Sequence, residues 1–291
     1  MQVMIELVGE QPIPNLLPVK YLKPSVLVLV RTDRTKLVAQ RLRCMLQAQV
    51  ELVNADPYSI TKLLKQLRDL IETRGWKSDQ LLFNLTGGTK PMSLAAFHLA
   101  ARLGVHCVYL QTEGGRSLLH SYRFREGELR LAGGSPQEIS SALTLDEYLG
   151  VHLGEYKAGS PRNDSERCIL GGLEPGVDEI MPSVTHGGAL EIDLVVRCAN
   201  QVGIAQVKTG RKASRSIGIN QLNTAGEQRY LGTYTHKFLM LDRDLEPNNR
   251  KLAEEHCITT IVLETLQSGD LSDPDKERLV RTVRDALGGE R

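Results

Sequence analysis

The feature that most constrains the fold is a series of short apolar runs that alternate with helical patterns in the first half of the chain. The run at 26–30 (VLVLV) has no polar position, which is typical of a strand buried on both faces of a sheet. Further strands are expected over 3–8, 50–53, 81–85 and 106–110, and helical periods fall at 37–46, 60–71 and 91–103. This alternation predicts a parallel, Rossmann-like sheet whose ligand lies at the carboxyl ends of the strands.

Three loops follow those strands, and one of them contains residues suited to an anion. The loop over 9–15 has a glycine and two prolines, and its Asn15 is expected to cap a short helix. Thr32-Asp33 is expected to cap the next helix. The segment 86–90 (TGGTK) precedes Pro91 at the start of a helix, where glycines and free N–H groups favour a phosphate. The alternative is a tight turn with a solvated lysine. The Walker pattern GxxxxGK[ST] is absent, so ATP hydrolysis is not indicated.

The second half of the chain contains an acid and a lysine on the two strands of a predicted hairpin. Asp193 lies in the alternating run at 190–196, and Lys208 ends the next run, after Gln206 and Val207. The polar turn at 199–201 joins the runs, so their far ends lie side by side. A carboxylate and an ammonium that converge in this way are able to hold a divalent metal and orient water for attack on a phosphodiester. Glu191 lies on the same face as Asp193 and is a further candidate ligand.

The sequence around this hairpin is basic and offers further polar candidates. No acid occurs from 194 to 226, which suits a strand that passes phosphates. The basic residues of that stretch are Arg197, Lys208, Arg211, Lys212 and Arg215. An additional acid is expected upstream, and the choice among Glu155, Glu166 and Asp178 stays open. His186 is better explained as a solvated loop residue than as a base. Gln221 and Tyr230, on a helix expected over 216–230, are candidate substrate contacts.

Two linked motifs resemble known families. The segments 7–24 and 84–92 (NLTGGTKPM), together with the strand end at 31–33, resemble the CRISPR-associated Rossmann-fold (CARF) sensor domain. The spacing D-x12-Q-x-K from Asp193 to Lys208 resembles the PD-(D/E)xK nuclease superfamily in its glutamine form. In this order the motifs resemble the sensor–nuclease fusions of type III CRISPR defence. Gln206 departs from the commoner glutamate, which predicts weaker metal binding or a greater dependence on Glu191 and substrate phosphate.

The resemblance implies a homodimer whose sensor domains bind a cyclic oligoadenylate, usually cyclic tetra-adenylate, as activator. It implies a sensor domain over 1–142 and a restriction-endonuclease-like α/β nuclease domain over 143–291 with an N-terminal linker helix. The ligand-binding residues would be Gln11, Asn15, Thr32, Asn84, Thr86, Gly87, Gly88, Thr89 and Lys90. The catalytic residues would be Asp193, Gln206, Lys208 and Glu191, and Mg²⁺ or Mn²⁺ would be held by Asp193, Gln206 and Val207. The expected substrate is nucleic acid, either DNA or RNA.

The remaining segments carry weaker signals. A hairpin is expected over 117–124 and 128–131 with its turn at 125–127, a linker over 133–137, a helix from Thr144, and a last helix capped by Asp273. No apolar run reaches eighteen residues and no signal peptide is present, which predicts a cytoplasmic protein without membrane contact. The five cysteines show no CxxC spacing, so we expect free thiols and no zinc site.

Two other functions compete with an activated nuclease. Gln206 favours a sensor whose second domain binds nucleic acid or a partner and cuts weakly or not at all. The third alternative is a ring nuclease that degrades the messenger in the sensor pocket. The net charge of +1 by itself argues neither for nor against nucleic acid, but a near-neutral chain with local basic stretches indicates short or small anionic ligands bound at defined places rather than a non-specific DNA coat. No helix-turn-helix pattern supports a transcription factor.

Overall fold

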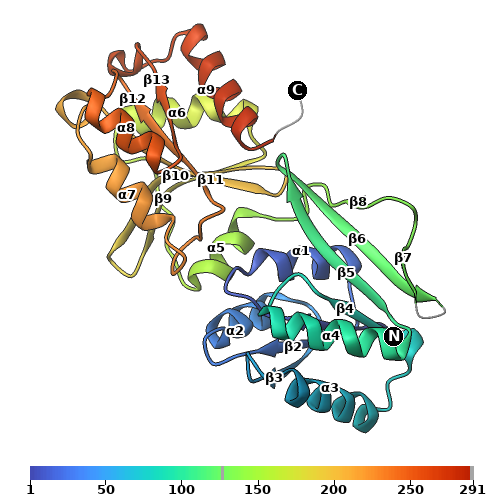
Figure 1. Ribbon diagram of the computed structural model, residues 1–291. Coiled ribbons are helices and arrows are strands. Elements are labelled where there is room, and N and C mark those ends of the chain that lie inside the picture. Colours follow the sequence, from blue (N-terminus) through green and yellow to red (C-terminus); the bar gives the residue numbers. More distant parts are fainter. Residues whose placement is uncertain (126–127, 289–291) are drawn as a thin grey trace. The chain divides into compact units, whose positions relative to one another are not determined.

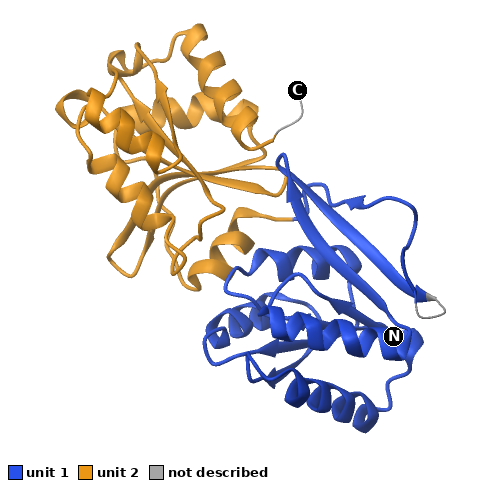
Figure 2. Ribbon diagram, in the orientation of Figure 1, with its two compact units in different colours: residues 1–142 blue, residues 143–291 orange. Residues whose placement is uncertain are grey.

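The computed structural model describes residues 1–125 and 128–288, which form two compact units (Figure 1). Unit 1 comprises residues 1–142 and unit 2 residues 143–291 (Figure 2). Each unit has its own sheet and its own hydrophobic core. Within the described ranges, no helix combines the length and the apolar character needed to cross a membrane.

Unit 1 is built on a mostly parallel sheet with the strand order β3-β2-β1-β4-β5-β6-β7. Its parallel strands are β1 (Val3–Leu7), β2 (Val26–Arg31), β3 (Gln49–Asn54), β4 (Leu81–Asn84) and β5 (His106–Glu113). The antiparallel β6 (Arg116–Arg125) and β7 (Glu128–Leu131) extend it, and the short β8 (Gln137–Glu138) pairs with β6. Strands β1 and β2 are buried on both faces, which explains their continuous apolar runs.

Helices cover both faces of this sheet. They are α1 (Ile13–Leu22), α2 (Lys36–Met45), α3 (Ile60–Arg74) and α4 (Lys90–Leu103). Helices α3 and α4 pack on one face, where Leu67 and Ala96 join a core with Val28 and Phe83. Helices α1 and α2 contact β1 and β2. The mixed α/β fold with a Rossmann-like sheet predicted for the first half is therefore present.

Two helix starts in unit 1 differ from the prediction because side chains bind elsewhere. Asn15 is the third residue of α1 and not its cap, since its amide donates hydrogen bonds to Glu6 and to the Leu7 carbonyl. Helix α2 follows Thr35, and not Thr32-Asp33, because Thr32 and Thr35 exchange backbone-to-hydroxyl hydrogen bonds.

Two further boundaries also differ. Helix α4 begins at Lys90 with Thr89 as its cap, one residue before the predicted Pro91. The expected linker at 133–137 lies inside unit 1, since β8 pairs with β6 and the unit continues to residue 142. Residues 126–127 of the predicted hairpin turn lie outside the described residues.

Unit 2 has a second sheet, with the order β13-β12-β11-β10-β9. Its strands are β9 (Glu179–His186), β10 (Leu190–Cys198), β11 (Gln201–Lys208), β12 (His236–Leu241) and β13 (Ile258–Val262). Strands β9, β10 and β11 are antiparallel, and β12 and β13 continue parallel to β11. The predicted hairpin is thus present as β10 and β11, with Leu194 opposite Ala205.

The helices of unit 2 divide between the two faces of its sheet. They are α5 (Leu145–Leu153), α6 (Asp164–Leu173), α7 (Ile217–Ala225), α8 (Pro247–Glu255) and α9 (Asp273–Ala286). Helices α6 and α9 pack on a core that contains Leu194, Val207 and Phe238. Helix α7 is shorter than the predicted 216–230. Helix α9 is capped by Ser272 and not by Asp273, because the Ser272 hydroxyl accepts from the Asp275 amide.

Candidate functional site

The sensor loops predicted from the sequence gather at one edge of the unit 1 sheet. Strands β2, β1 and β4 are parallel neighbours, so the loops that follow them, at Thr32, 9–15 and 86–90, leave the sheet at the same end. Lys90 is exposed at the first position of α4, where the helix dipole also favours an anion. Gln11 is partly exposed in the first of these loops. This edge is therefore a candidate phosphate-binding site.

The backbone of the 86–90 loop lies directly against the end of β1. A Cβ added at Gly87 would stand 2.0 Å from the Leu7 carbonyl oxygen, and one added at Gly88 would stand 2.9 Å from the Leu7 side chain. Gly88 also has a φ of 74°, which a side chain rarely adopts. The two glycines are thus required by close approach to β1 and by a left-handed conformation, respectively.

A buried carboxyl group that the sequence analysis missed holds these loops together. Glu6 in β1 is fully buried, and its oxygens accept from Asn15 Nδ2 at 2.5 Å and from Asn84 Nδ2 at 3.1 Å. Asn84 in turn accepts from the Thr86 amide and hydroxyl. Asn15 accepts from the Gly9 amide. Burial raises the pKa of Glu6 to about 8, against the smaller opposing effect of the two amides.

Several predicted ligand-binding side chains are already engaged within unit 1. Asn15 and Asn84 are fully enclosed by the protein, so they shape the loops from beneath. The Thr86 hydroxyl accepts from the Leu110 amide at 2.8 Å, and the Thr89 hydroxyl donates to the Pro57 carbonyl at 2.5 Å. Among the predicted residues, the backbone of the glycine loop, the exposed Lys90 and the partly exposed Gln11 remain for a ligand. A signal for Glu6 exists in the sequence, since it is a lone acid inside the apolar run at 3–8.

In unit 2 the predicted acid, glutamine and lysine meet on one face of the β10–β11 hairpin. Lys208 Nζ lies 3.1 Å from Asp193 Oδ2 and 2.5 Å from Gln206 Oε1. The Val207 amide donates to Asp193 Oδ2 at 2.8 Å, and Gln206 Nε2 donates to the Glu191 carbonyl at 2.8 Å. Asp193 and Gln206 are buried. Asp193 and Gln206 alternate along their strands with residues of the core that contacts α6 and α9. The two side chains therefore lie on the opposite face of the sheet from α6 and α9.

Helix α7 covers the lysine on that face. A Cβ added at Gly218 would stand 3.2 Å from Lys208 Cγ, so the glycine lets the helix approach the lysine stem. Gln221, also on α7, has a buried Oε1 without a hydrogen-bond partner among the described residues. Tyr230 follows the helix and lies edge-on to His186, with 6.3 Å between ring centroids. His186 Nδ1 donates to the Glu155 carbonyl.

The upstream acids predicted as alternatives occupy different places. Glu166 is buried in α6, where it accepts from the Arg162 amide at 2.8 Å and from Asn163 Nδ2 at 2.7 Å. The Arg162 guanidinium pairs with Glu191, so Glu166 is linked to the Asp193 face through one residue. Asp178 lies at the other end of the hairpin, where it binds Arg197. Glu166 is thus connected to Glu191 through Arg162, whereas the Glu155 carbonyl contacts His186.

The donor atoms of this site fit a hard cation. Asp193 Oδ2 and Gln206 Oε1 both contact the single ammonium of Lys208, so the two oxygens converge on one point. Carboxylate and amide oxygens are ligands suited to Mg²⁺ or Mn²⁺. Among the described residues, no group of three or more His, Cys, Asp and Glu side chains is placed to hold a metal. A metal bound here would therefore need the amide oxygen and main-chain or substrate oxygens besides Asp193.

Comparison with known proteins assigns the first unit to a family. The family model of the Card1 CARF domain matches residues 3–148, which is half of the chain. The chain belongs to the Card1 CARF domain family. A search of the curated proteins finds no match.

Solved structures extend the likeness of this CARF protein to the whole fold. Can2 from Sulfobacillus thermosulfidooxidans, solved with cyclic tetra-adenylate, is 15% identical with a TM-score of 0.74, and the alignment covers 99% of both chains. Protein VC1899 from Vibrio cholerae is 13% identical with a TM-score of 0.73 over 99% of both chains. A type III CRISPR defence DNA nuclease activated by cyclic oligoadenylate is 16% identical with a TM-score of 0.59. That alignment covers 97% of this chain and 44% of the nuclease. At these identities the likeness shows the shared fold, with a CARF unit followed by a second α/β unit.

Proposed function

We propose that this protein is a metal-dependent nuclease that a cyclic oligoadenylate activates in type III CRISPR defence. Unit 1 is the sensor, and unit 2 is a PD-(D/E)xK-like nuclease. The observation that carries the proposal is the convergence of Asp193 Oδ2 and Gln206 Oε1 on Lys208 Nζ at 3.1 and 2.5 Å. A carboxylate, an amide oxygen and a lysine on one strand pair supply metal ligands and a positive charge for an attacked phosphate.

The basic surface beside Lys208 supports a nucleic acid substrate. Arg211, Lys212 and Arg215 follow the lysine directly and are exposed. The turn that carries Arg211 and Lys212 is held in place by Asp242, whose carboxylate accepts from the Gly210 amide at 2.7 Å. Fixed positive charges next to the proposed metal site would draw the phosphate backbone toward Asp193.

Cyclic tetra-adenylate is the proposed activator because of the loop chemistry of unit 1. Backbone N–H groups at 87–90 and the Lys90 ammonium bind phosphate oxygens. Membership of the CARF family and the cyclic tetra-adenylate bound by Can2 agree with this ligand. We propose that two copies of the chain form a homodimer, because two such loops would match the two-fold symmetry of the ring.

A cleavage assay on the full chain tests both halves of the proposal. Plasmid, single-stranded DNA and RNA are incubated with Mg²⁺ or Mn²⁺, with and without cyclic tetra-adenylate. We expect cleavage only when metal and activator are both present. Asp193→Asn should lower the rate by about 100-fold or more. Asp244→Asn, which removes an exposed ion pair with Arg250, should change it less than about twofold.

Measuring the affinity for cyclic tetra-adenylate tests the activator part of the proposal separately. Lys90→Ala should weaken cyclic tetra-adenylate binding by about tenfold, because it removes one charge-assisted contact. Lys65→Ala, at an exposed position of α3, is the matched control. Unchanged cleavage by Asp193→Asn would overturn the catalytic assignment. Activator binding without cleavage of any substrate would replace the nuclease by the non-catalytic sensor.

A further inference from the structure

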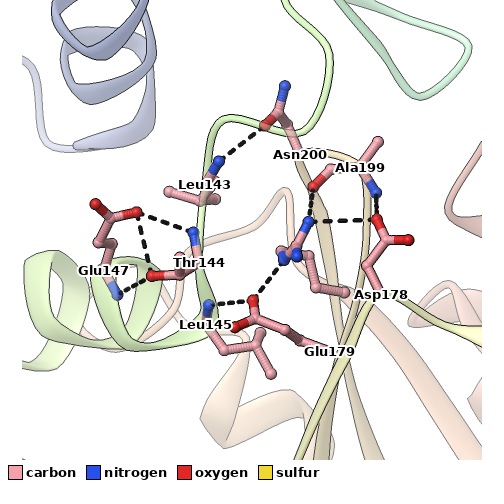
Figure 3. Close-up of polar contacts among 9 residues, drawn as sticks. Leu143, Thr144, Leu145, Glu147, Asp178, Glu179, Ala199 and Asn200 are labelled. Carbon is pink, nitrogen blue, oxygen red and sulfur yellow. Dashed lines mark hydrogen bonds and ion pairs between the residues drawn. The ribbon is translucent and has the colours of Figure 1, made fainter. Parts of the chain in front are cut away.

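The first residues of unit 2 are tied to the turn of the hairpin that carries the proposed catalytic residues. The Leu143 amide donates to Asn200 Oδ1 at 3.2 Å, and the Leu145 amide donates to Glu179 Oε2 at 2.8 Å (Figure 3). Asn200 lies in the two-residue turn between β10 and β11, and Glu179 is the first residue of β9. The chain therefore attaches to the hairpin immediately after the last residue of unit 1.

A buried arginine fixes this attachment. Arg197 donates from Nε to Glu179 Oε2 at 2.6 Å and from Nη1 to the Ala199 carbonyl at 2.6 Å, and only 8% of its side chain is exposed. Asp178 accepts from the Ala199 amide at 2.7 Å (Figure 3). Ala199 has a φ of 51°, a left-handed conformation that costs a non-glycine residue energy. Arg197 and Asp178 thus hold the turn in one strained shape, and Arg197 also holds Glu179, which binds the incoming chain.

The attached segment continues into a helix with a fixed start. The Thr144 hydroxyl accepts from the Glu147 amide, and the Glu147 carboxylate accepts from the Thr144 amide, which forms a capping box for α5 (Figure 3). One turn later, the buried Tyr148 hydroxyl contacts Thr235 Oγ1 at 2.6 Å and donates to the Leu231 carbonyl. Helix α5 is therefore bound at its start and along its length.

Arg197, which holds Glu179 and the turn in place, belongs to the same strand as the proposed catalytic acid. Asp193, Val195 and Arg197 alternate along β10 and share a face, and α5 contacts β9 and β10. Arg197 follows Asp193 by four residues, which is about 13 Å along a strand. A strand with its ladder of hydrogen bonds intact moves as one body over such a length, so a shift at the turn also moves Asp193 relative to α7.

We infer that Asn200, Glu179 and Arg197 are positioning residues that transmit activator binding from the end of unit 1 to Asp193 and Lys208. Any movement of the chain at residue 142 reaches residues 143–145, which pull on the turn through Asn200 and Glu179. The inference rests on the proposed function and adds its regulation. These three residues lie away from the proposed ligand and metal contacts, so their effect is on coupling and not on binding or chemistry.

The test compares activator binding with activated cleavage in the full chain. Asn200→Ala removes the acceptor for Leu143, and Asn200→Asp keeps it. We expect Asn200→Ala to lower the cleavage rate at saturating cyclic tetra-adenylate by about tenfold or more, with the dissociation constant of the activator and the KM of the nucleic acid unchanged. Asn200→Asp should restore most of the rate. Asp244→Ala, which breaks a surface ion pair, is the control and should cut like wild type.

The outcomes separate this inference from the proposed function. Absence of activated cleavage in wild type defeats the proposed function itself. Wild-type rates in Asn200→Ala overturn the inference alone, and so does a loss that Asn200→Asp does not restore. If Asn200→Ala does not fold, the inference is tested by amide hydrogen exchange of the wild-type chain with and without activator. Activator should then change exchange at the Leu143 and Leu145 amides and at the β10–β11 amides together, and a change confined to either set overturns the coupling.

Discussion

At the scale of single residues, Glu6 has the most demanding surroundings in unit 1. Its carboxyl group is fully buried in the central strand, and its polar contacts are amide groups of Asn15 and Asn84. A carboxylate in such a place is costly to desolvate, so the protonated form is favoured and the pKa rises to about 8. The loops proposed to bind the activator therefore rest on a group that titrates near neutral pH.

Glu6→Gln should change how stability depends on pH. Between a pKa of 4.5 in the unfolded chain and about 8 in the folded chain, the folded state binds a proton that the unfolded state lacks. The contribution of Glu6 to the unfolding free energy is therefore complete below the unfolded-state pKa and is lost as the pH rises through the folded-state pKa. The loss is about 1.4 kcal/mol for each unit of difference between the two pKa values. Denaturant unfolding at pH 5, 7 and 9 measures the unfolding free energy of both proteins. The value for wild type minus the value for Glu6→Gln should fall as the pH rises across this range.

The matched control is Glu113→Gln, which changes an exposed carboxyl group at the end of β5. Its stability should run parallel to that of wild type at all three pH values. A constant difference between Glu6→Gln and wild type would contradict the assignment of a raised pKa to Glu6.

The two candidate sites differ in how far the sequence predicts them at this scale. Asp193, Gln206 and Lys208 come from one hairpin, so a local turn fixes which side chains meet. Glu6 meets Asn84 because β1 pairs with β4, with Glu6 opposite Asn84 in the register. That pairing joins distant parts of the chain, and no local pattern reveals it.

At the scale of elements, the strand-to-helix turn at 86–90 is determined by contact with β1. Gly87→Ala would place a methyl group 2.0 Å from the Leu7 carbonyl oxygen, so the loop must move away from the strand. We expect unit 1 to lose about 1–3 kcal/mol of unfolding free energy and to bind the activator more weakly. Thermal unfolding and activator titration measure the two effects.

Gly9→Ala is the control for this change, because its added Cβ would meet its nearest neighbour, the Gly88 nitrogen, at 3.5 Å, an ordinary contact. Its stability should differ from wild type by less than about 0.5 kcal/mol. Equal stability of Gly87→Ala and wild type would show that the loop adjusts without cost.

The strands and helices themselves are well predicted by periodicity, whereas their ends are not. The apolar runs of β1 and β2 reflect burial on both faces, a property of each segment alone. The start of α1 depends on whether Asn15 caps its own helix or binds Glu6 in β1. Tertiary contacts decide such boundaries, so the sequence places them a few residues away.

At the scale of the whole molecule, the proposed activation requires the two units to respond to one ligand. Each unit carries one exposed cysteine, Cys44 in unit 1 and Cys257 in unit 2, while Cys107 and Cys198 are buried. In a Cys168→Ser background, a donor and an acceptor dye on these thiols report the separation between the units. Labelled chains are mixed with excess unlabelled chain so that each proposed dimer carries one dye pair.

We expect cyclic tetra-adenylate to change the energy transfer between the dyes, because movement at residue 142 must precede the pull on Asn200. A ligand that binds without altering the transfer efficiency would contradict a change in unit arrangement. The sequence could not indicate the contacts behind the proposed coupling, since the contact between Arg197 and Glu179 arises from the register of β9 with β10.

The position of β1 in the middle of the unit 1 sheet has a consequence for synthesis. Among the strands of this sheet, β1 is synthesised first, yet one of its two partners, β4, ends at residue 84. At about 5–20 residues per second, roughly 4–15 s pass before β4 follows β1 out of the exit tunnel. During that interval an apolar nascent strand has an open edge, which a chaperone would protect until β4 is available to pair with it.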